Sequence, residues 1–351
     1  MDISKLLSVI IPVYNTADYL EQCVNSVLQQ KYSPMEIIII NDCSTDDSRF
    51  LIDKLAELDS RIKVVHKTIN EGVGCARNTG IALAKGSFFT FIDSDDWLEP
   101  DVYSKMMNKM IQANLDIIQG KMVLDFGMYV LCSKDTEVLK IFLTEEAQLS
   151  LMLLREITAS VCDKIFKAEI FTNINFNNTR IYEDTEILFL LINESKKVGF
   201  YDKSTYRYRQ NINSLSHQPI SIEKALLSME ICKKRIMFFE KKSEILYFSA
   251  KKKYFTKIIG IYYTLDKKQY GSGKFLIELC LTANNLLQEI LPKMPMKERI
   301  LLKLLAKSLR NNFAGFFLKP IVAFLYGRKK WGLGLDLRKS AINVNLKKNM
   351  Q

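Results

Sequence analysis

Histidine, glycine and proline are scarce in this sequence, and their scarcity excludes several classes of protein. Two histidines, His66 and His217, are too few for a histidine dyad or a histidine-rich metal site, so acid–base chemistry falls to carboxylates. Only 14 glycines and 7 prolines occur in 351 residues, and 48% of the residues are hydrophobic, which predicts a globular protein with a large core. The seven cysteines stand singly, without a Cys-x-x-Cys pair, which fits neither a disulfide scaffold nor a zinc ribbon and indicates a reducing compartment.

Long apolar runs are also lacking. Residues 1–7 carry no basic segment followed by an apolar stretch, so we expect no signal peptide. The longest apolar stretch near the end, residues 313–327, is interrupted by Lys319 and Pro320 and is shorter than the ~20 residues that cross a bilayer. The sequence therefore predicts no membrane-spanning helix.

Positive charge is unevenly placed along the chain. The formal net charge is +11, yet residues 293–351 hold 14 Lys or Arg against Glu298 and Asp336. The preceding residues 1–292 are close to neutral. This asymmetry predicts an anionic partner for the carboxyl-terminal segment, with membrane lipid and nucleic acid as the candidates.

The first 120 residues alternate between short apolar runs and helical patterns. The runs predict strands at 7–13, 36–40, 63–66 and 87–92, and the helical patterns cover 20–28, 50–58 and 74–84, with a fourth helix opening at Pro100. Thr16 is expected to cap the first helix, and Ser44 and Thr45 precede the second. This order predicts an α/β fold whose parallel sheet is buried on both faces.

Later residues divide into a mixed region and a helical one. Between 115 and 215 we expect a helix at 145–155, another from Asp184 and a strand at 205–209; helices follow at 225–240, 246–265, 273–291 and 297–309. The predicted domains are an α/β domain over residues 1–215 and a helical region over 216–351. Its last part, from about 293, forms a basic amphipathic tail.

Polar clusters follow two of the predicted strands, at residues 41–47 and 93–97. Because ligands bind at the carboxyl ends of strands in open α/β sheets, both acidic clusters share the edge where a ligand is expected. Carboxylates gathered there favour Mg²⁺ or Mn²⁺, which also hold substrate phosphates. The alternative is structural: Asp42 and Ser44 cap a helix, and residues 93–96 form a solvated turn.

A glycine pair and an arginine open the third predicted helix. Gly72-Val73-Gly74 is a weak phosphate signal, because it lacks the spacing of a dinucleotide-binding loop, and a plain glycine turn explains it as well. Arg77 lies in the first turn of that helix, where the helix dipole does not favour a cation. An anionic ligand would account for it.

Four segments in order carry a family resemblance: SVIIPVYN at 8–15, EIIIINDCSTD at 36–46, GCARNTG at 74–80 and FIDSDDW at 91–97. They resemble the successive signatures of family 2 glycosyltransferases with the GT-A fold, of the type that assembles bacterial surface polysaccharides. A looser similarity continues through 168–171, 182–184 and 206–214 and ends before residue 220.

The resemblance implies a nucleotide site on the first strands. Pro12, Tyr14 and Asp42 would line the base, with the Asp42 carboxylate accepting the N3–H of a uracil, which favours a UDP-sugar donor. Arg77 would contact the nucleotide or its phosphates. Asp93 would hold the ribose or a metal-bound water.

The same resemblance implies a metal and a base. In the D-x-D pair, Asp95 would bind Mn²⁺ or Mg²⁺, with Asp93 a less certain ligand and Asp96 a supporting residue. In the pair Glu183-Asp184, Asp184 would be the catalytic base that deprotonates the acceptor hydroxyl for attack with inversion. Glu183 would be a candidate for acceptor or diphosphate binding. Helix capping is the alternative interpretation of Asp184.

Further residues are candidates for acceptor or diphosphate binding. Arg207 and Arg209 alternate with tyrosines, so strand spacing places both on one face, where they suit a diphosphate of the donor or of a lipid-linked acceptor. A solvated edge strand is equally compatible. Trp97 follows the D-x-D pair and either stacks on an acceptor sugar or packs beneath the sheet.

The expected activity is therefore transfer of a sugar from a UDP-sugar to a hydroxyl of a glycan or lipid-linked acceptor, in capsule, exopolysaccharide or lipopolysaccharide synthesis. Apolar residues on one face and basic residues on another at 299–310 resemble an interfacial anchor, which places the enzyme at the cytoplasmic face of the plasma membrane, although a helical cap on the catalytic domain is the alternative. We expect no nucleic-acid partner. Rival functions are a nucleotidyltransferase, which needs a basic glycine-rich loop where Tyr14-Asn15-Thr16 stands, and a non-catalytic membrane- or nucleic-acid-binding module.

Overall fold

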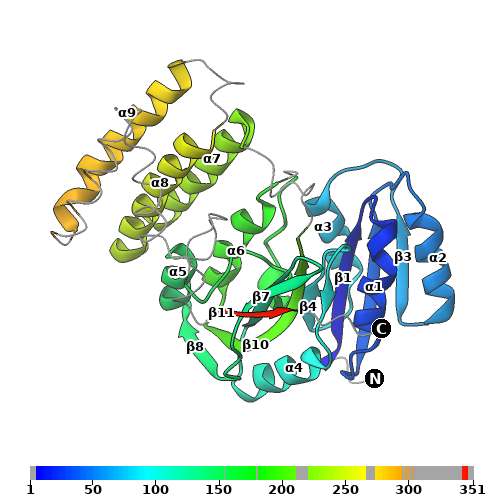
Figure 1. Ribbon diagram of the computed structural model, residues 1–351. Helices are drawn as coiled ribbons and strands as arrows, with labels where there is room; N and C mark the ends of the chain where they lie inside the picture. Colours follow the sequence, from blue (N-terminus) through cyan, green and yellow to red (C-terminus); the bar gives the residue numbers. More distant parts are fainter. Residues whose placement is uncertain are drawn as a thin grey trace. The chain divides into compact units, whose positions relative to one another are not determined.

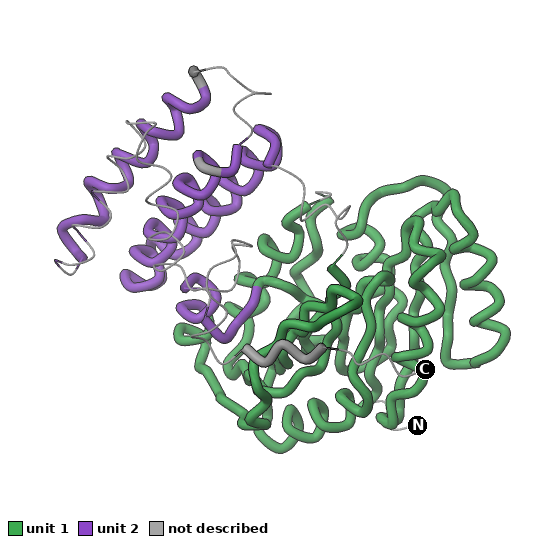
Figure 2. Tube along the Cα trace, in the orientation of Figure 1, with its two compact units in different colours: residues 1–147, 159–212, 335–351 green, residues 148–158, 213–334 purple. Residues whose placement is uncertain are grey.

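The computed structural model describes residues 5–153, 155–178, 181–210, 220–265, 273–294 and 342–346, together with Met296, Arg299 and Lys303 (Figure 1). The chain forms two compact units (Figure 2). Unit 1 holds residues 1–147, 159–212 and 335–351, and unit 2 holds residues 148–158 and 213–334. The main division between the units, after residue 212, is close to the predicted boundary at 215. Two segments lie on the other side of this division in the sequence: residues 148–158 belong to unit 2, and residues 335–351 belong to unit 1.

Unit 1 is built on one mixed sheet. Its strands are β1 Leu7–Val13, β2 Met35–Asn41, β3 Ile62–His66, β4 Phe88–Phe91, β5 Trp97–Leu98, β6 Ile117–Asp125, β7 Tyr129–Ser133, β8 Leu139–Leu143, β9 Lys164–Lys167, β10 Lys197–Arg209 and β11 Ile342–Leu346. The order across the sheet is β11-β7-β6-β9-β4-β1-β2-β3, and β10 pairs with β5, β6 and β8. Strands β1 to β4 are parallel, which brings their carboxyl ends to one edge.

The predicted parallel core is confirmed at its centre. Every residue of β1 and β2 is buried, and the register pairs Ile10 with Ile38. A strand without polar alternation must be covered on both faces, which is why LSVIIPV and MEIIIIN lie in the interior of the sheet.

The helices of unit 1 are α1 Ala17–Leu28, α2 Ser48–Leu58, α3 Val73–Leu83, α4 Val102–Gln112, α5 Thr144–Met152, which continues into unit 2, the 3₁₀ turn η2 Ala168–Phe171 and α6 Glu183–Glu194. Helix α3 packs on β1 and β2, and α2 packs on β3. A Cβ on Gly80 of α3 would lie 2.4 Å from Cγ2 of Ile10. Glycine at this position therefore lets the helix approach the central strand closely.

Several expected helix ends are wrong in detail. The fourth helix begins at Val102 after Asp101, not at Pro100. Thr16 precedes α1 without capping it, because its hydroxyl lies 2.8 Å from the Ser94 hydroxyl. The amide of Ala17 donates instead to the Asp46 carboxylate at 3.0 Å.

Helix α2 buries only a narrow face. Phe50 and Leu58 are 69% and 74% exposed, while Ser48, Ile52 and Leu55 are buried. The helix begins at Ser48 with Asp47 at the N-cap position, so Ser44 and Thr45 lie in the preceding loop.

Strands β6 to β9 lay in the region that the sequence left unassigned, and β10 is much longer than the predicted strand at 205–209. Register shifts between Phe200, Ser204 and Tyr206 bend β10. Its first part pairs with β8 and its last part with β5, while β6 runs beside both. A bent strand presents short, interrupted periodicity, which explains why only its end was recognised.

Unit 2 is helical in its described residues. Its long helices are α7 Ile222–Phe239, α8 Glu244–Thr264 and α9 Gly273–Ile290, followed by the 3₁₀ turn η3 Leu291–Lys293. Ser221 and Ser243 cap α7 and α8 by accepting backbone N–H bonds from Lys224 and Leu246. The three predicted helices at 225–240, 246–265 and 273–291 are thus present.

Of the predicted helix at 297–309, only Arg299 and Lys303 are among the described residues, and both are helical. The apolar stretch at 313–327 and His217 lie outside the described residues. No helix among the described residues is long and apolar enough to cross a membrane. Strand β11 falls within the segment predicted as an amphipathic tail, and it pairs antiparallel with β7. All seven cysteines are free thiols.

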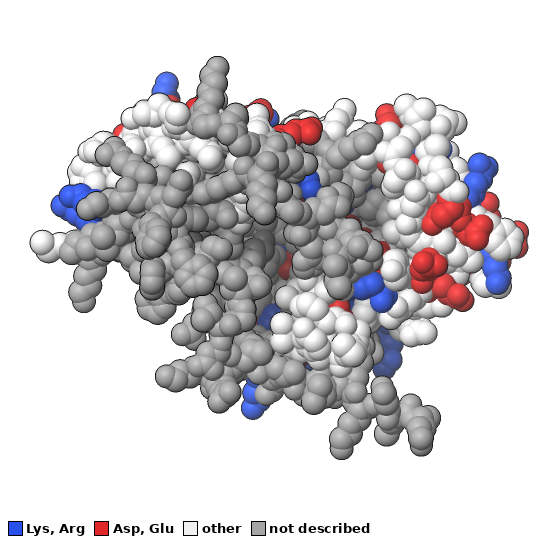
Figure 3. Space-filling view, turned by 45° about the horizontal axis from the view of Figure 1, so that its top comes forward, with Lys and Arg blue, Asp and Glu red and all other residues white. Residues whose placement is uncertain are grey.

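Acidic side chains gather at the end of unit 1 that carries α1 and α2 (right-hand side of Figure 3). Exposed carboxylates there include Asp18, Glu21, Asp47 and Glu57.

Candidate active site

The carboxyl ends of β1, β2 and β4 bring three polar segments together. Tyr14 follows β1, Asp42 follows β2 and Asp93 lies two residues after β4. The first two loops are tied to each other: the Asn15 amide donates to the Ser44 hydroxyl at 3.1 Å, and the Thr45 amide donates to the Asn15 side-chain oxygen at 2.8 Å. The edge is a connected surface and not a set of independent loops.

Three residues at this edge or beside it adopt left-handed backbone conformations without being glycine. Asn15 has φ 52°, Cys43 has φ 63° and Tyr182 has φ 64°. Such conformations are uncommon for non-glycine residues, most of all for a bulky tyrosine, and cluster at functional sites. Tyr182 directs the chain into α6, so that Glu183 and Asp184 occupy its first turn.

Asp42 is buried and bound by donors from one neighbouring loop. Its carboxylate accepts the amides of Glu71 and Gly72 at 3.1 and 2.7 Å and pairs with Lys67 at 3.2 Å. It therefore does not cap α2, which was the structural alternative. Gly72 has φ 93°, a conformation that favours glycine, and it forms the turn before α3. A plain glycine turn therefore explains this residue without a phosphate. Tyr14 is 48% exposed beside this loop system, and Pro12 is buried in β1.

The D-x-D segment places its carboxylates in unlike environments. Asp96 is buried, accepts the Tyr206 hydroxyl at 2.6 Å and the Arg209 amide at 2.8 Å, and burial raises its pKa well above the usual range. Asp95 is partly exposed, and burial together with the charge of Asp93 raises its pKa to about 6. Asp96 therefore forms hydrogen bonds to β10, while Asp95 stays partly exposed.

Arg77 joins the two acidic motifs. Its Nη2 donates to Asp93 at 2.8 Å, and its Nη1 donates to Glu183 and to Asp184, each at 2.7 Å. Only 2% of its side chain is exposed, and its guanidinium lies over the ring of Phe176 at 5.3 Å. The contact with nucleotide or phosphate that we predicted for Arg77 has no support in this arrangement, because its Nη atoms are taken up by carboxylates.

Asp184 combines a fixed position with a raised proton affinity. Its second oxygen accepts the Val161 amide at 3.1 Å, so it bonds to another segment and does not cap its own helix. Burial and the nearby charges of Glu183 and Asp93 raise its pKa to about 7, against the opposing effect of Arg77. A carboxyl that titrates near neutrality is suited to accept a proton.

Arg209 and Arg207 diverge although they lie two residues apart. Arg209 donates through Nε to the Asp95 carbonyl at 2.8 Å, and its guanidinium lies 4.6 Å from the rings of both Tyr19 and Trp97. Arg207 pairs instead with Glu99 at 2.5 Å and with Asp125 at 3.2 Å. Only Arg209 contacts the D-x-D segment, and Trp97 contacts Arg209 rather than packing wholly beneath the sheet.

Sequence reasoning missed several supporting residues. Asn78 exchanges two hydrogen bonds with the backbone of Phe176, at 2.8 and 2.9 Å, and so fixes the segment that carries the ring under Arg77. The Tyr206 hydroxyl also accepts the Asp93 amide at 3.2 Å. Tyr206 lies in the alternation of tyrosine and arginine at residues 206–209, and its side chain is buried. The alternation could have indicated that the tyrosines face the interior and can bond to the D-x-D segment.

A divalent cation fits the D-x-D segment in part. The Asp95 carboxylate accepts no hydrogen bond from another residue among those the structure describes, and it is a hard oxygen ligand. Within the same described residues, no group of three His, Cys, Asp or Glu side chains surrounds a metal position. The residues present therefore suit a cation that takes its other ligands from phosphate and water.

These features agree with comparisons to known proteins. The model of glycosyl transferase family 2 matches residues 8–174. An uncharacterised glycosyltransferase of Haemophilus influenzae is 32% identical over 196 residues, which cover 56% of this chain and 75% of that protein. The chain belongs to glycosyl transferase family 2.

Other members of the family match over different lengths. Glycosyltransferase GlyG of Streptococcus pneumoniae is 28% identical over 66% of this chain and 80% of its own length. The putative teichuronic acid biosynthesis glycosyltransferase TuaG of Bacillus subtilis is 40% identical, over 31% of this chain and 43% of its own length.

Solved structures show that the fold is of the GT-A type. TarS of S. aureus, residues 1–349 in complex with UDP-GlcNAc, superposes with a TM-score of 0.64 at 19% identity and covers 98% of each chain. GalNAc-T7 with UDP, GalNAc and Mn²⁺ gives a TM-score of 0.52 at 15% identity, over 68% of this chain and 50% of its own. The family-2 glycosyltransferase described here thus has the fold that its strand motifs predicted.

Proposed function

We propose that this family-2 glycosyltransferase moves a sugar from a UDP-sugar to a hydroxyl of a glycan or lipid-linked acceptor, with inversion and with a divalent cation. One observation carries the proposal: a single buried guanidinium, that of Arg77, bonds both Asp93 of the D-x-D segment and Asp184 of α6. Arg77 thereby links the candidate base Asp184 to the D-x-D segment, where the metal is proposed to bind.

The donor assignment rests on the edge of β1 and β2. Tyr14 offers an exposed ring for a base, and Asp42 is held by backbone amides with carboxylate lone pairs left for a further donor such as a uracil N3–H. TarS, which shares the fold, has been crystallised with UDP-GlcNAc and with UDP. These points favour uridine as the nucleotide, with Pro12 beneath it in β1.

Asp95 is the proposed ligand of Mn²⁺ or Mg²⁺, with Asp93 beside it. A bound cation would offset the negative charge that collects on the departing diphosphate, a role for which no histidine is available in the described site. Arg209 adds positive charge at the Asp95 turn, and GalNAc-T7, of like fold, was solved with Mn²⁺.

Asp184 is the proposed base. With a pKa near 7 it can take the proton of an acceptor hydroxyl at neutral pH and release it again. Arg77 and the Val161 amide fix its two oxygens, which orients the carboxylate, and Glu183 shares Arg77 and balances its charge. Direct attack by a single activated hydroxyl gives inversion at the anomeric carbon.

Surface polysaccharide is the proposed product class, supported by the similarity to TuaG, a putative teichuronic acid biosynthesis glycosyltransferase. We further propose a cytoplasmic enzyme that meets lipid-linked acceptors at the inner membrane surface. The basic surplus of residues 293–351 supports this placement through attraction to anionic lipid.

The test is release of UDP from a panel of UDP-sugars with Mn²⁺ or Mg²⁺. We expect one donor to be hydrolysed slowly, and Asp95→Ala to reduce the rate at least about 100-fold, as loss of a principal electrostatic stabiliser does. Asp184→Asn should lose turnover while UDP still binds. Asp53→Ala, an exposed change on α2, is the matched control and should keep the wild-type rate.

Two outcomes would overturn the proposal. If no UDP-sugar binds at any metal concentration, the uracil assignment of Asp42 fails. If UDP-sugars bind but Asp95→Ala leaves turnover intact, the metal assignment fails. Binding of DNA in the absence of UDP binding would favour the non-catalytic alternative.

A further inference from the structure

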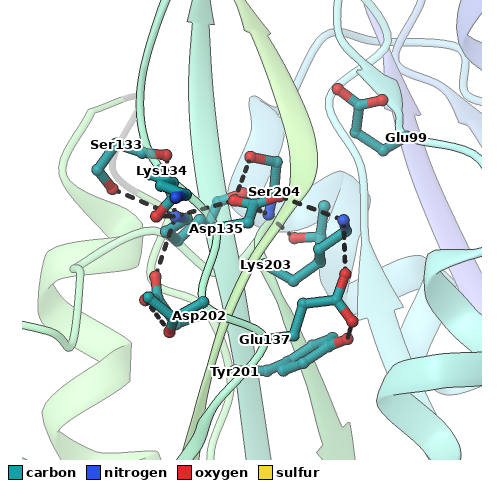
Figure 4. Close-up of polar contacts among 12 residues, drawn as sticks. Glu99, Ser133, Lys134, Asp135, Glu137, Tyr201, Asp202, Lys203 and Ser204 are labelled. Atoms are coloured by element: carbon teal, nitrogen blue, oxygen red, sulfur yellow. Dashed lines mark hydrogen bonds and ion pairs between the residues drawn. The ribbon is translucent and has the colours of Figure 1, made fainter. Parts of the chain in front are cut away.

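Unit 1 contains a pocket whose lining includes none of the residues proposed to bind the donor or the metal. Its volume is about 500 Å³, a size typical of small-molecule sites. Val123, Val130 and Cys132 form an apolar part of its lining, and the polar part comes from the loop after β7, from β10 and from the start of α4. Figure 4 shows Lys134 and Asp135 of that loop and Lys203 and Ser204 of β10.

The pocket is connected to the catalytic edge through two residues. Glu99 and Arg207 line it, and they bond each other at 2.5 Å. Arg207 is two residues before Arg209 on β10, and Glu99 is four residues after Asp95. Since one strand residue advances the chain by about 3.3 Å, the Arg207 backbone lies roughly 7 Å from that of Arg209, the residue that contacts the D-x-D segment.

The acidic side chains that line the pocket all form ion pairs, whereas two of the basic ones form none with the residues that the structure describes. Both acidic side chains are already paired, Glu99 with Arg207 and Asp135 with Lys121 at 2.9 Å and Lys203 at 3.3 Å. By contrast, Lys105 and Lys134 are exposed and form no ion pair with any residue in the described ranges. Glu137, which feels the charge of Lys105, is itself held by Lys203 at 2.8 Å.

Hydrogen bonds from neighbouring strands fix the loop that carries Lys134. Lys121 is 7% exposed, and its ammonium donates to the carbonyls of Ser133 and Lys134 at 3.1 and 2.9 Å. Asp135 accepts the amide and the hydroxyl of Ser204 at 3.0 and 2.9 Å, as Figure 4 shows. Because the backbone is held on both sides of Lys134, the site is formed before any ligand binds.

We propose that this pocket binds an anionic group of the acceptor, a sugar that carries a phosphate or a carboxylate, between Lys105 and Lys134. The assignment of the bound sugar as an acceptor rests on the proposed function. Apolar lining residues would contact the sugar ring, and the two free ammonium groups would take the anion. The enzyme would then select charged glycans over neutral ones.

The experiment titrates the full chain with glucose 6-phosphate, glucuronic acid and neutral glucose, followed by ligand-observed NMR. We expect at least one of the charged sugars to bind more tightly than glucose. The variant Lys105→Glu with Lys134→Glu should weaken that binding by roughly tenfold or more, because each reversal replaces an attraction by a repulsion. Lys31→Glu with Lys54→Glu, two exposed lysines elsewhere in unit 1, is the charge-matched control and should bind as the wild type does.

The phosphate and carboxylate arms identify which anion is preferred. Equal binding of all three sugars, or equal loss in the two double variants, would overturn the proposal, provided that thermal unfolding shows both variants to be folded. UDP binding by the wild type is measured in parallel. If UDP fails to bind while charged sugars still depend on Lys105 and Lys134, the donor assignment falls and the anion site stands; the reverse result removes the anion site alone.

Discussion

At the scale of single residues, Arg77 changes the picture of the site. An arginine in the first turn of a helix suggested an anionic ligand, and anions are indeed what it meets, but they are the side chains of Asp93, Glu183 and Asp184. These carboxylates lie up to 107 residues from Arg77 in the sequence, so no local pattern could predict that they contact it. The predicted anionic ligand of Arg77 is therefore not needed to explain its position, because carboxylates of the chain itself surround the guanidinium.

Removing the guanidinium should destabilise the protein strongly. Arg77→Ala would leave three carboxylates without their shared cation, and loss of one partner of a buried pair costs about 3–5 kcal/mol. Urea unfolding measures the change in free energy. Arg77→Lys should recover part of the loss, since a single ammonium cannot bridge all three acids.

Arg49→Ala, an exposed change on α2, is the control and should alter the free energy of unfolding by less than about 0.5 kcal/mol. If Arg77→Ala is no more harmful than Arg49→Ala, the cluster does not stabilise unit 1.

The raised pKa of Asp184 predicts a pH dependence of stability. An unfolded aspartate has a pKa of about 3.9, so between that value and about 7 the folded state binds the proton more tightly. This contribution to stability is complete below the unfolded pKa and is lost as the pH rises through about 7. Asp184→Asn removes it, so the difference in unfolding free energy between wild type and variant should shift in favour of the variant from pH 4.5 to 7.5.

Asp95 and Asp96 also have raised pKa values, but they are present in both proteins and cancel in the difference. A difference that is constant across this range, measured by urea unfolding, would mean that Asp184 is ionised throughout.

At the scale of elements, uninterrupted apolar strands were predictable and bent or half-exposed ones were not. β1 and β2 can be recognised in the sequence because a strand buried on both faces is a continuous apolar run. β7 and β8 have mixed burial, and β10 is bent, so their patterns are short and ambiguous. For the same reason the acidic motifs after β2 and β4 could be located from the sequence, while the pocket of β6, β7 and β10 could not.

The close contact of α3 with β1 gives a test at this scale. Gly80→Ala gains helix propensity, but its Cβ would lie 2.4 Å from Cγ2 of the fully buried Ile10, and overpacking of this kind costs about 1–3 kcal/mol. We expect net destabilisation in urea unfolding. Combining it with Ile10→Ala should cost less than the sum of the single changes, because the methyl group that clashes is gone. Strict additivity would show that α3 moves away from the sheet instead.

At the scale of the whole molecule, positive charge is distributed unevenly along the chain. Acidic side chains gather at the α1 and α2 end of unit 1 (Figure 3), while the surplus of 14 basic over two acidic residues falls in 293–351. Such a distribution of charge favours an anionic partner for residues 293–351, as we proposed.

Binding to anionic vesicles tests this division of charge. Each basic residue near an anionic leaflet contributes about 1 kcal/mol, and salt screens exposed charges over roughly 8 Å at physiological ionic strength. The full chain should therefore float with vesicles that contain anionic lipid and not with neutral ones, and 0.5 M NaCl, about three times that ionic strength, should release it. Replacing Arg328, Lys329 and Lys330 by glutamate should abolish flotation, whereas the same change at Lys31, Lys54 and Lys85 in unit 1 should not. If both triple variants lose binding equally, net charge alone governs association; if neither does, the basic segment serves the fold and not the membrane.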